Sequence, residues 1–102
     1  MAGYVTVGPS ELIGEGETAA FDIEGDEIAV ARVGGALYAF ADVCSHRRCT
    51  LSTGELDGTS ITCECHGSVF SIATGAPENP PATEPIAVYP VREQDGQIQV
   101  EV

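Results

Sequence analysis

Residues 44–46 of the chain read Cys44-Ser45-His46, and residues 63–66 read Cys63-Glu64-Cys65-His66. These two segments hold both His residues of the chain and three of its four Cys residues. Each contains a Cys followed by a His, spaced C-x-H in the first segment and C-x-x-H in the second. Thiolates and imidazoles are ligands for zinc, copper and iron–sulfur clusters. The pattern therefore indicates a metal site, in particular a redox-active one.

The rest of the chain consists of short β-prone runs broken by Gly, Pro and Asp. Turns are expected at 24–26, 34–35, 57–58 and 95–96, where Gly follows or precedes an acidic residue or a second Gly, and those at 24–26 and 95–96 are expected to close hairpins. The segment 76–85 holds four Pro residues and should be an extended loop. Residues 9–12 favour one helical turn at most. Strands are expected at 4–7, 18–23, 27–32, 36–41, 60–62, 69–72, 86–91 and 97–102, which predicts an all-β fold, a small antiparallel β-sandwich or barrel.

The composition of the chain disfavours some classes of binding partner. The chain has 102 residues, which fits one domain, and its net charge of −12 comes from sixteen acids against four Arg. Such a surface disfavours nucleic acid and anionic membranes, and it suits a basic protein partner. No signal peptide and no apolar run long enough to span a membrane stand out. We therefore expect a cytoplasmic protein without a membrane segment, in which a secreted disulfide framework is disfavoured.

The spacing of the Cys and His residues leaves several chemistries open. Structural zinc would use Cys44, His46, Cys63 and His66, although zinc ligand pairs are usually spaced more widely than C-x-H. A site of four Cys would leave both His unexplained. A mixed Cys₂His₂ iron–sulfur cluster uses both His and is favoured by the spacing. A catalytic Cys–His pair is disfavoured because no orienting third group stands out.

In its ligand segments and their surroundings, the chain resembles the Rieske 2Fe–2S proteins. Gly67-Ser68 follows the second His, Phe70 comes two residues later, Thr74-Gly75 ends the next strand, and a Pro-rich segment follows. The resemblance covers residues 40–91, and the length is similar to soluble Rieske-type ferredoxins of bacterial oxygenases. It implies one 2Fe–2S cluster in a single Rieske domain over 1–102, with a cluster-binding subdomain of two ligand loops and a Pro-rich loop over 42–85.

The resemblance also implies roles for individual residues. Cys44 and Cys63 would hold the inner iron, and His46 and His66 the outer iron. Cys49 and Cys65 stand where Rieske subunits of cytochrome bc complexes form a disulfide, so the resemblance implies a Cys49–Cys65 bridge. Further residues are expected around the cluster or at its surface: Ser68, Phe70, Pro80 and Pro81 beside it, and Arg47 and Arg48 as a docking contact or a nearby positive charge.

Together these features predict an electron carrier that is not itself an enzyme. By resemblance, it would pass single electrons from a flavin-dependent ferredoxin reductase to a terminal oxygenase, such as one that hydroxylates aromatic rings. Two alternatives stay open at this point. One is a small Rieske subunit of a larger oxidoreductase such as a nitrite reductase, and the other is a structural zinc module that mediates protein contacts.

Overall fold

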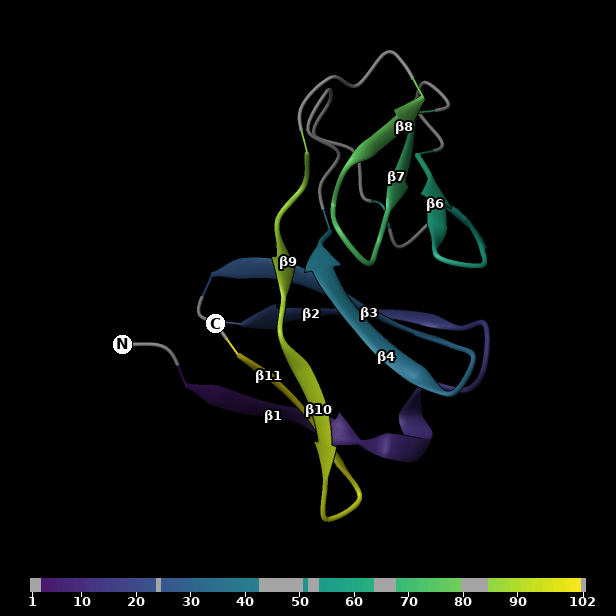
Figure 1. Ribbon diagram of the computed structural model, residues 1–102. Helices are drawn as coiled ribbons and strands as arrows, with labels where there is room; N and C mark the ends of the chain where they lie inside the picture. Colours follow the sequence, from purple (N-terminus) through teal and green to yellow (C-terminus); the bar gives the residue numbers. More distant parts are fainter. Residues whose placement is uncertain are drawn as a thin grey trace.

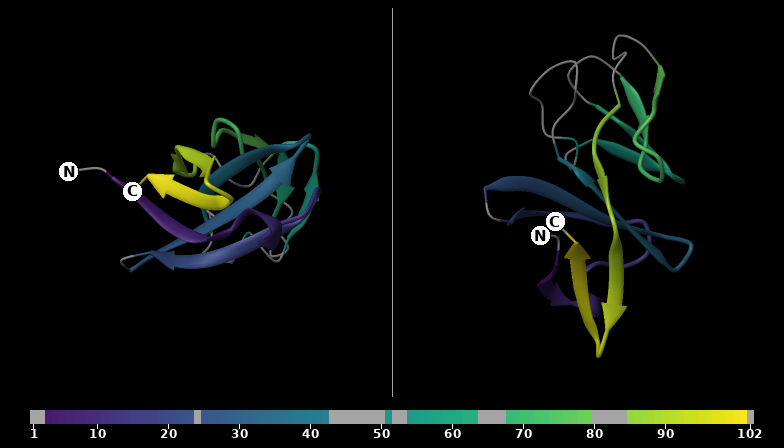
Figure 2. Two further views of the ribbon diagram at one scale, coloured as in Figure 1. Left: turned by 90° about the horizontal axis from the view of Figure 1, so that it is seen from below. Right: turned by 60° about the vertical axis from the view of Figure 1, so that its left-hand side comes forward.

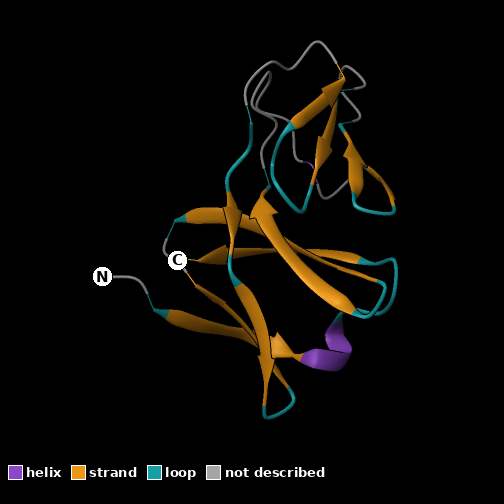
Figure 3. Cartoon of the chain, in the orientation of Figure 1, coloured by secondary structure: helices purple, strands orange, loops and turns teal. Residues whose placement is uncertain are grey.

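The computed structural model describes residues 3–23, 25–42, 51, 54–63, 68–79 and 85–101. Within them the fold is all-β apart from one 3-10 turn, η1, as the sequence predicted (Figures 1 and 3). The elements are β1 (Tyr4–Pro9), η1 (Ser10–Leu12), β2 (Thr18–Ile23), β3 (Asp26–Val33), β4 (Ala36–Ala41), β5 (Glu55–Asp57), β6 (Ser60–Thr62), β7 (Val69–Ser71), β8 (Pro77–Asn79), β9 (Val88–Tyr89), β10 (Val91–Gln94) and β11 (Gln97–Glu101).

These strands form three antiparallel sheets with the orders β1-β11-β10, β2-β3-β4-β9 and β5-β6-β7-β8. The first two sheets face each other and make up the body of the molecule (Figure 2). The third sheet lies above the body in Figure 1. No helix in the described part of the chain is long and apolar enough to cross a membrane.

Strand β3 is buried on both faces and links two apolar cores. Because successive side chains of a strand point to opposite faces, Ala29 and Ala31 enter one core while Ile28 and Val30 enter the other. Each fully buried Ile or Phe stabilises the fold by about 1.5–3 kcal/mol. We call the two sets the body core, Ile13, Ile23, Ile28, Val30, Ala39, Ile98 and Val100, and the junction core, Ala29, Ala31, Phe40, Leu51, Ile61, Cys63, Phe70, Ile72 and Ile86.

Arg32, near the end of β3, fastens the segment between β1 and β2 to the body. Its Nε donates a hydrogen bond to the Ile13 carbonyl at 2.7 Å, and its Nη2 donates to the Ser10 carbonyl at 2.9 Å. Both terminal nitrogens also lie 3.2 Å from the carboxylate of Glu93 on β10. The Arg32 side chain is only 15% exposed. One guanidinium thus joins η1 and its exit, β3 and β10.

The turn expected at 57–58 lies where β5 joins β6, with Asp57 paired to Ser60. The register of the strands confirms the turns expected at 24–26, 34–35 and 95–96. At the last of these turns Asp95 and Gly96 both have positive φ, 54° and 73°. This geometry matches the right-handed twist of the strands, and it explains the Asp-Gly pair.

Two predictions about the C-terminal half were wrong. The strand expected at 86–91 is divided at Pro90: β9 pairs with β4 in one body sheet, and β10 pairs with β11 in the other. Proline has no N–H to donate to a ladder, so the chain changes sheets there. The segment 76–85 is not wholly a loop, because β8 pairs with β7 at the edge of the third sheet. Strand β5 was also not expected.

Candidate metal centre

The first ligand segment starts and ends at a closed base. The N–H of Leu51 donates a hydrogen bond to the carbonyl of Asp42 at 3.2 Å, and the N–H of Asp42 donates to the carbonyl of Glu27 at 2.9 Å. Asp42 and Leu51 are buried, with 1% and 0% of their surface exposed. The chain therefore leaves β4 and returns at adjacent points, with positions 43–50 between them.

The second ligand segment has a base of the same kind. It lies between β6 and β7, whose last paired residues are Thr62 and Val69. The N–H of Cys63 donates to the carbonyl of Ser68 at 2.7 Å. Both residues are buried, Cys63 at 1% and Ser68 at 0% exposure. The two residues that flank positions 64–67 are therefore joined by a hydrogen bond at the end of the β6–β7 hairpin.

Gly54 brings these two bases together. Its N–H donates to the Leu51 carbonyl at 2.9 Å. A Cβ added at Gly54 would overlap the carbonyl oxygen of Thr62, the residue before Cys63. Only glycine allows this close approach of two backbones. The end of the first ligand segment is thus packed directly against the start of the second.

Gly75 allows a second close approach of two backbones, beside the Pro-rich segment. The N–H of Ile86 donates to the Gly75 carbonyl at 2.8 Å, and a Cβ at Gly75 would overlap the carbonyl oxygen of Ile86. Gly75 also has a φ of 83°, which a residue with a side chain rarely adopts. Ile86, which follows the Pro-rich segment in the sequence, is therefore held against the turn that follows β7.

Cys63 carries the chemistry of the described part of this region. It lies in the junction core with Phe40 and Phe70, each with no exposed surface. A buried thiolate shielded by aromatic rings fits a soft metal centre kept from water, and it fits a 2Fe–2S cluster in particular. Within the described residues no group of three His, Cys, Asp or Glu could hold a metal ion elsewhere.

Three of the twelve predicted site residues, Cys63, Ser68 and Phe70, lie in the described chain, and all three are buried in one region. Phe70 is a core residue there, pairing with Ile61 of β6 and Pro77 of β8. Sequence reasoning missed Leu51 and Gly54 as determinants of this region, and it identified Gly75 only as the end of a strand. No turn pattern around Gly54 would have marked it. The other nine predicted site residues lie outside the described chain: Cys44, His46, Arg47, Arg48, Cys49, Cys65, His66, Pro80 and Pro81.

Comparison with known proteins identifies this arrangement. The model of the Rieske [2Fe-2S] domain matches residues 3–90. The chain belongs to the Rieske [2Fe-2S] family. It carries one 2Fe–2S cluster, so of the chemistries open to the sequence an iron–sulfur cluster is confirmed.

The relatives of this Rieske protein are small ferredoxins. It is 39% identical to the anthranilate 1,2-dioxygenase ferredoxin subunit of Burkholderia cepacia over 102 residues, which is 100% of this chain and 94% of that one. The ferredoxin of carbazole 1,9a-dioxygenase from Nocardioides aromaticivorans IC177 superposes with a TM-score of 0.91 at 33% identity, covering 95% of each chain. A complex of reduced oxygenase and oxidized ferredoxin in carbazole 1,9a-dioxygenase contains a chain with the same TM-score at 35% identity, covering 95% of this chain and 91% of that one. The chain is therefore a Rieske-type ferredoxin, an electron carrier rather than a catalyst.

Proposed function

We propose that this ferredoxin carries single electrons from a flavin-dependent ferredoxin reductase to a terminal oxygenase that acts on aromatic compounds. The observation that carries the proposal is the buried Cys63 at the base of a closed loop, in a chain matched end to end by a ferredoxin subunit of a dioxygenase. Relatives that are ferredoxin components of dioxygenase systems favour a carrier over a subunit of a nitrite reductase, and a cytoplasmic location is part of the proposal.

We assign the cluster ligands to Cys44, His46, Cys63 and His66, in a cluster-binding subdomain over 42–85. The cluster supplies one-electron redox chemistry, and neutral imidazole ligands raise its potential above that of a Cys₄ cluster. The chain would hold it between two loops whose bases Gly54 packs together. The EPR spectrum of the reduced protein tests the ligand set, because the mean g value differs between Cys₂His₂ and Cys₄ clusters.

Other residues would tune and shield the site. Ser68 is fully buried beside Cys63 and is a candidate hydrogen-bond donor to a cluster sulfur, which would stabilise the reduced form. Ser68→Ala should then lower the reduction potential. Phe70 has no hydroxyl to make a second such bond. Pro80 and Pro81 would cover the cluster from water.

We further propose that Cys49 and Cys65 form a disulfide that joins the two ligand loops. Closing a loop of this length stabilises a chain by roughly 3 kcal/mol in the loop-entropy model, and the gain here is smaller because the cluster already closes an overlapping loop. Non-reducing mass spectrometry of the alkylated holo protein should show no free thiol at either position. Two alkylated thiols would refute the bridge.

Arg47 and Arg48 are the proposed docking cations at the cluster. The other two Arg residues of the chain already have partners: the largely buried Arg32 is bound by Ser10, Ile13 and Glu93, and the exposed Arg92 donates to Gln99 at 2.7 Å. The Arg92 guanidinium also lies 3.8 Å from the centre of the Tyr4 ring. Arg47 and Arg48 are therefore the remaining cations of a chain with a net charge of −12.

Reconstitution tests the function. The holo protein is mixed with a flavin-dependent reductase, its nicotinamide cofactor and a terminal oxygenase, and product formation is followed. We expect turnover that depends on this ferredoxin and is lost in the His66→Cys variant. The proposal would be contradicted if the reductase reduces the holo protein but the oxygenase forms no more product than it does without any carrier.

A further inference from the structure

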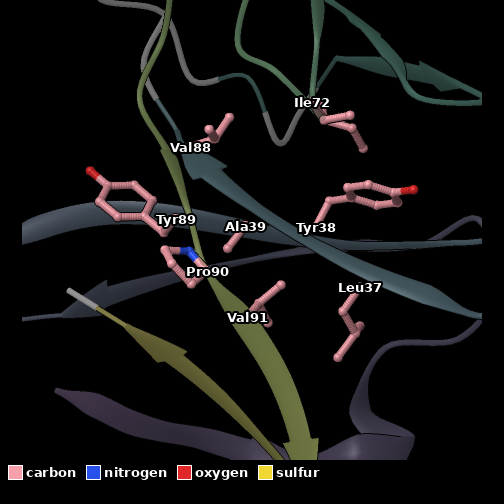
Figure 4. Close-up of a pocket in the computed structure, with 9 residues that line it drawn as sticks. Leu37, Tyr38, Ala39, Ile72, Val88, Tyr89, Pro90 and Val91 are labelled. Carbon is pink, nitrogen blue, oxygen red and sulfur yellow. The ribbon is translucent and has the colours of Figure 1, made fainter.

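An apolar groove of about 430 Å³ opens where β4, the turn after β7, and the β9–β10 segment meet (Figure 4). Nine residues line it and none is charged. Figure 4 shows Tyr38 and Tyr89 on opposite sides, with their hydroxyls directed away from each other and with Ala39 and Val88 between them. The register pairs Phe40 with Val88 and Ala39 with Tyr89, so Val88 and Tyr38 share one face of the β4–β9 pair, and Ala39 and Tyr89 share the other.

Val88 exposes an apolar side chain in the groove. It is 39% exposed, and only two other large hydrophobic residues in the described chain are comparably exposed, Leu12 at 50% and Tyr4 at 37%. Tyr4 is covered on one ring face by Arg92, and Leu12 lies in η1 away from any described groove. Val88 alone combines exposure with a concave apolar setting. An exposed apolar surface of this kind is typical of a contact with another protein.

The charges beside the groove are negative. Burial raises the pKa of the Tyr89 hydroxyl, and the nearby carboxylate of Asp26 raises it further. The two cations of the described chain, Arg32 and Arg92, do not line the groove. The electrostatic field here therefore favours a positively charged visitor.

We propose that this groove is a docking site for the terminal oxygenase, which places one apolar side chain against Val88 and Tyr38 and basic side chains near Asp26. The inference rests on the proposed electron-carrier function. The oxygenase is the occupant because a solved complex of a related ferredoxin is with an oxygenase, and because the groove suits a basic surface with an apolar anchor. The contact is distinct from the ligand loops, so it adds orientation to the approach of the cluster.

Steady-state kinetics of the oxygenase, with the reduced ferredoxin as the varied substrate, test the contact. Val88→Ser removes this apolar side chain, and we expect the KM for the ferredoxin to rise roughly three- to tenfold with kcat unchanged. Val88→Thr keeps the β-branched shape that the strand favours and should give a smaller rise in the same direction. The matched control is Leu12→Ser, which removes an equally exposed apolar side chain elsewhere and should leave KM unchanged.

Charge is tested in the same assay. Asp26→Asn should raise KM at low salt and have little effect at high salt, because exposed charges are screened there. Asp95→Asn, at the tip of the β10–β11 hairpin, is the control and should change nothing. Turnover with the wild-type ferredoxin but an unchanged KM in both Val88 variants would overturn the docking site alone. No turnover with the wild type would refute the proposed function instead.

A peptide probe separates the groove from the assay. In NMR titrations, the capped tripeptide Lys-Leu-Lys should shift the signals of Val88 and Tyr89 in the wild type, whereas Lys-Ser-Lys should not. Equal shifts from both peptides would mean charge attraction without an apolar site. Two results would assign the groove to another occupant and overturn the proposal. One is a dimer of the free ferredoxin, seen by sedimentation, that Val88→Ser dissociates. The other is a change in KM that is seen with the reductase and not with the oxygenase.

Discussion

Replacing Arg32 by Met should destabilise the body of the ferredoxin without altering its redox properties. Methionine keeps most of the apolar volume of the side chain and removes the guanidinium. The Ser10 and Ile13 carbonyls would then lose donors at 2.9 and 2.7 Å, in a place where the replaced side chain is 15% exposed. The link from η1 and its exit to β3 would be broken.

The magnitude follows from these two hydrogen bonds. A hydrogen bond from a charged group contributes about 1.5–3 kcal/mol, and water can replace part of it at a site that is not fully buried, so we expect a loss of about 3 kcal/mol. For a domain of about this size, that loss lowers the melting temperature by roughly 10–20 °C. The half-exposed contact with Glu93 adds little, because solvent screens it.

Arg92→Met is the matched control. It also removes one guanidinium, but its hydrogen bond to Gln99 and its contact with the Tyr4 ring are exposed, and together they are worth about 0.5–1 kcal/mol. The two variants are compared by circular dichroism melts at one scan rate and by protein-film voltammetry. A fall in melting temperature for Arg32→Met no larger than that for Arg92→Met would refute the reasoning. So would a large change in reduction potential.

Three further predictions concern the loops, the acid sensitivity and the cluster. Gly54→Ala forces a Cβ against the Thr62 carbonyl and should speed the loss of the cluster in denaturant by about tenfold, if overpacking costs about 1.4 kcal/mol. Visible absorbance follows the loss. Gly3→Ala is the control, because a Cβ there meets nothing within 4 Å, and it should not change the rate. The amides of Gly34 and Gly35 hold the pKa of the Glu15 carboxyl below its usual value. The stability that this carboxylate contributes is therefore fully present above the usual pKa and is lost as the pH falls through the lower pKa of the folded state. Melting temperatures measured against pH should fall less in acid for Glu15→Gln than for the control Glu11→Gln. Phe70→Tyr should raise the reduction potential, because its hydroxyl can donate to a ligand sulfur, and an unchanged voltammogram would contradict that geometry.

The sequence predicted the parts of the fold that local chemistry determines. The turn at 95–96 needs two residues of positive φ, and the sequence Asp95-Gly96 is typical of such a turn. Likewise Phe40 and Tyr38 alternate with smaller residues, so their common face was predictable, and both do pack in the junction core. The ligand pattern was informative for a different reason, since few centres use two Cys and two His at such spacing.

The features that the sequence could not show depend on partners distant in the chain. Gly54 is indispensable only because Thr62 comes close to it, and nothing in its neighbouring residues reveals that approach. Strand β8 forms in a Pro-rich segment because Asn79 and Pro77 lie beside β7 at a sheet edge, where a missing donor is tolerated. Arg32 reads as an ordinary strand residue, and its three acceptor groups come from positions 10, 13 and 93.

The acidic N-terminal third has a structural use beyond solubility. A net charge of −12 opposes compaction through self-repulsion, so carboxylates need local compensation. Glu17 accepts the N–H of Gly14 at 2.7 Å, Asp22 accepts that of Gly25 at 3.0 Å, and Glu15 accepts two amides at the β3–β4 turn. In each case a negative charge satisfies a loop amide that has no ladder partner. Asp26, by contrast, makes no such bond among those recorded for the described chain and lies beside the groove at Tyr89. Removal of the Asp26 charge should therefore weaken the contact with a partner more than it changes the stability of the fold.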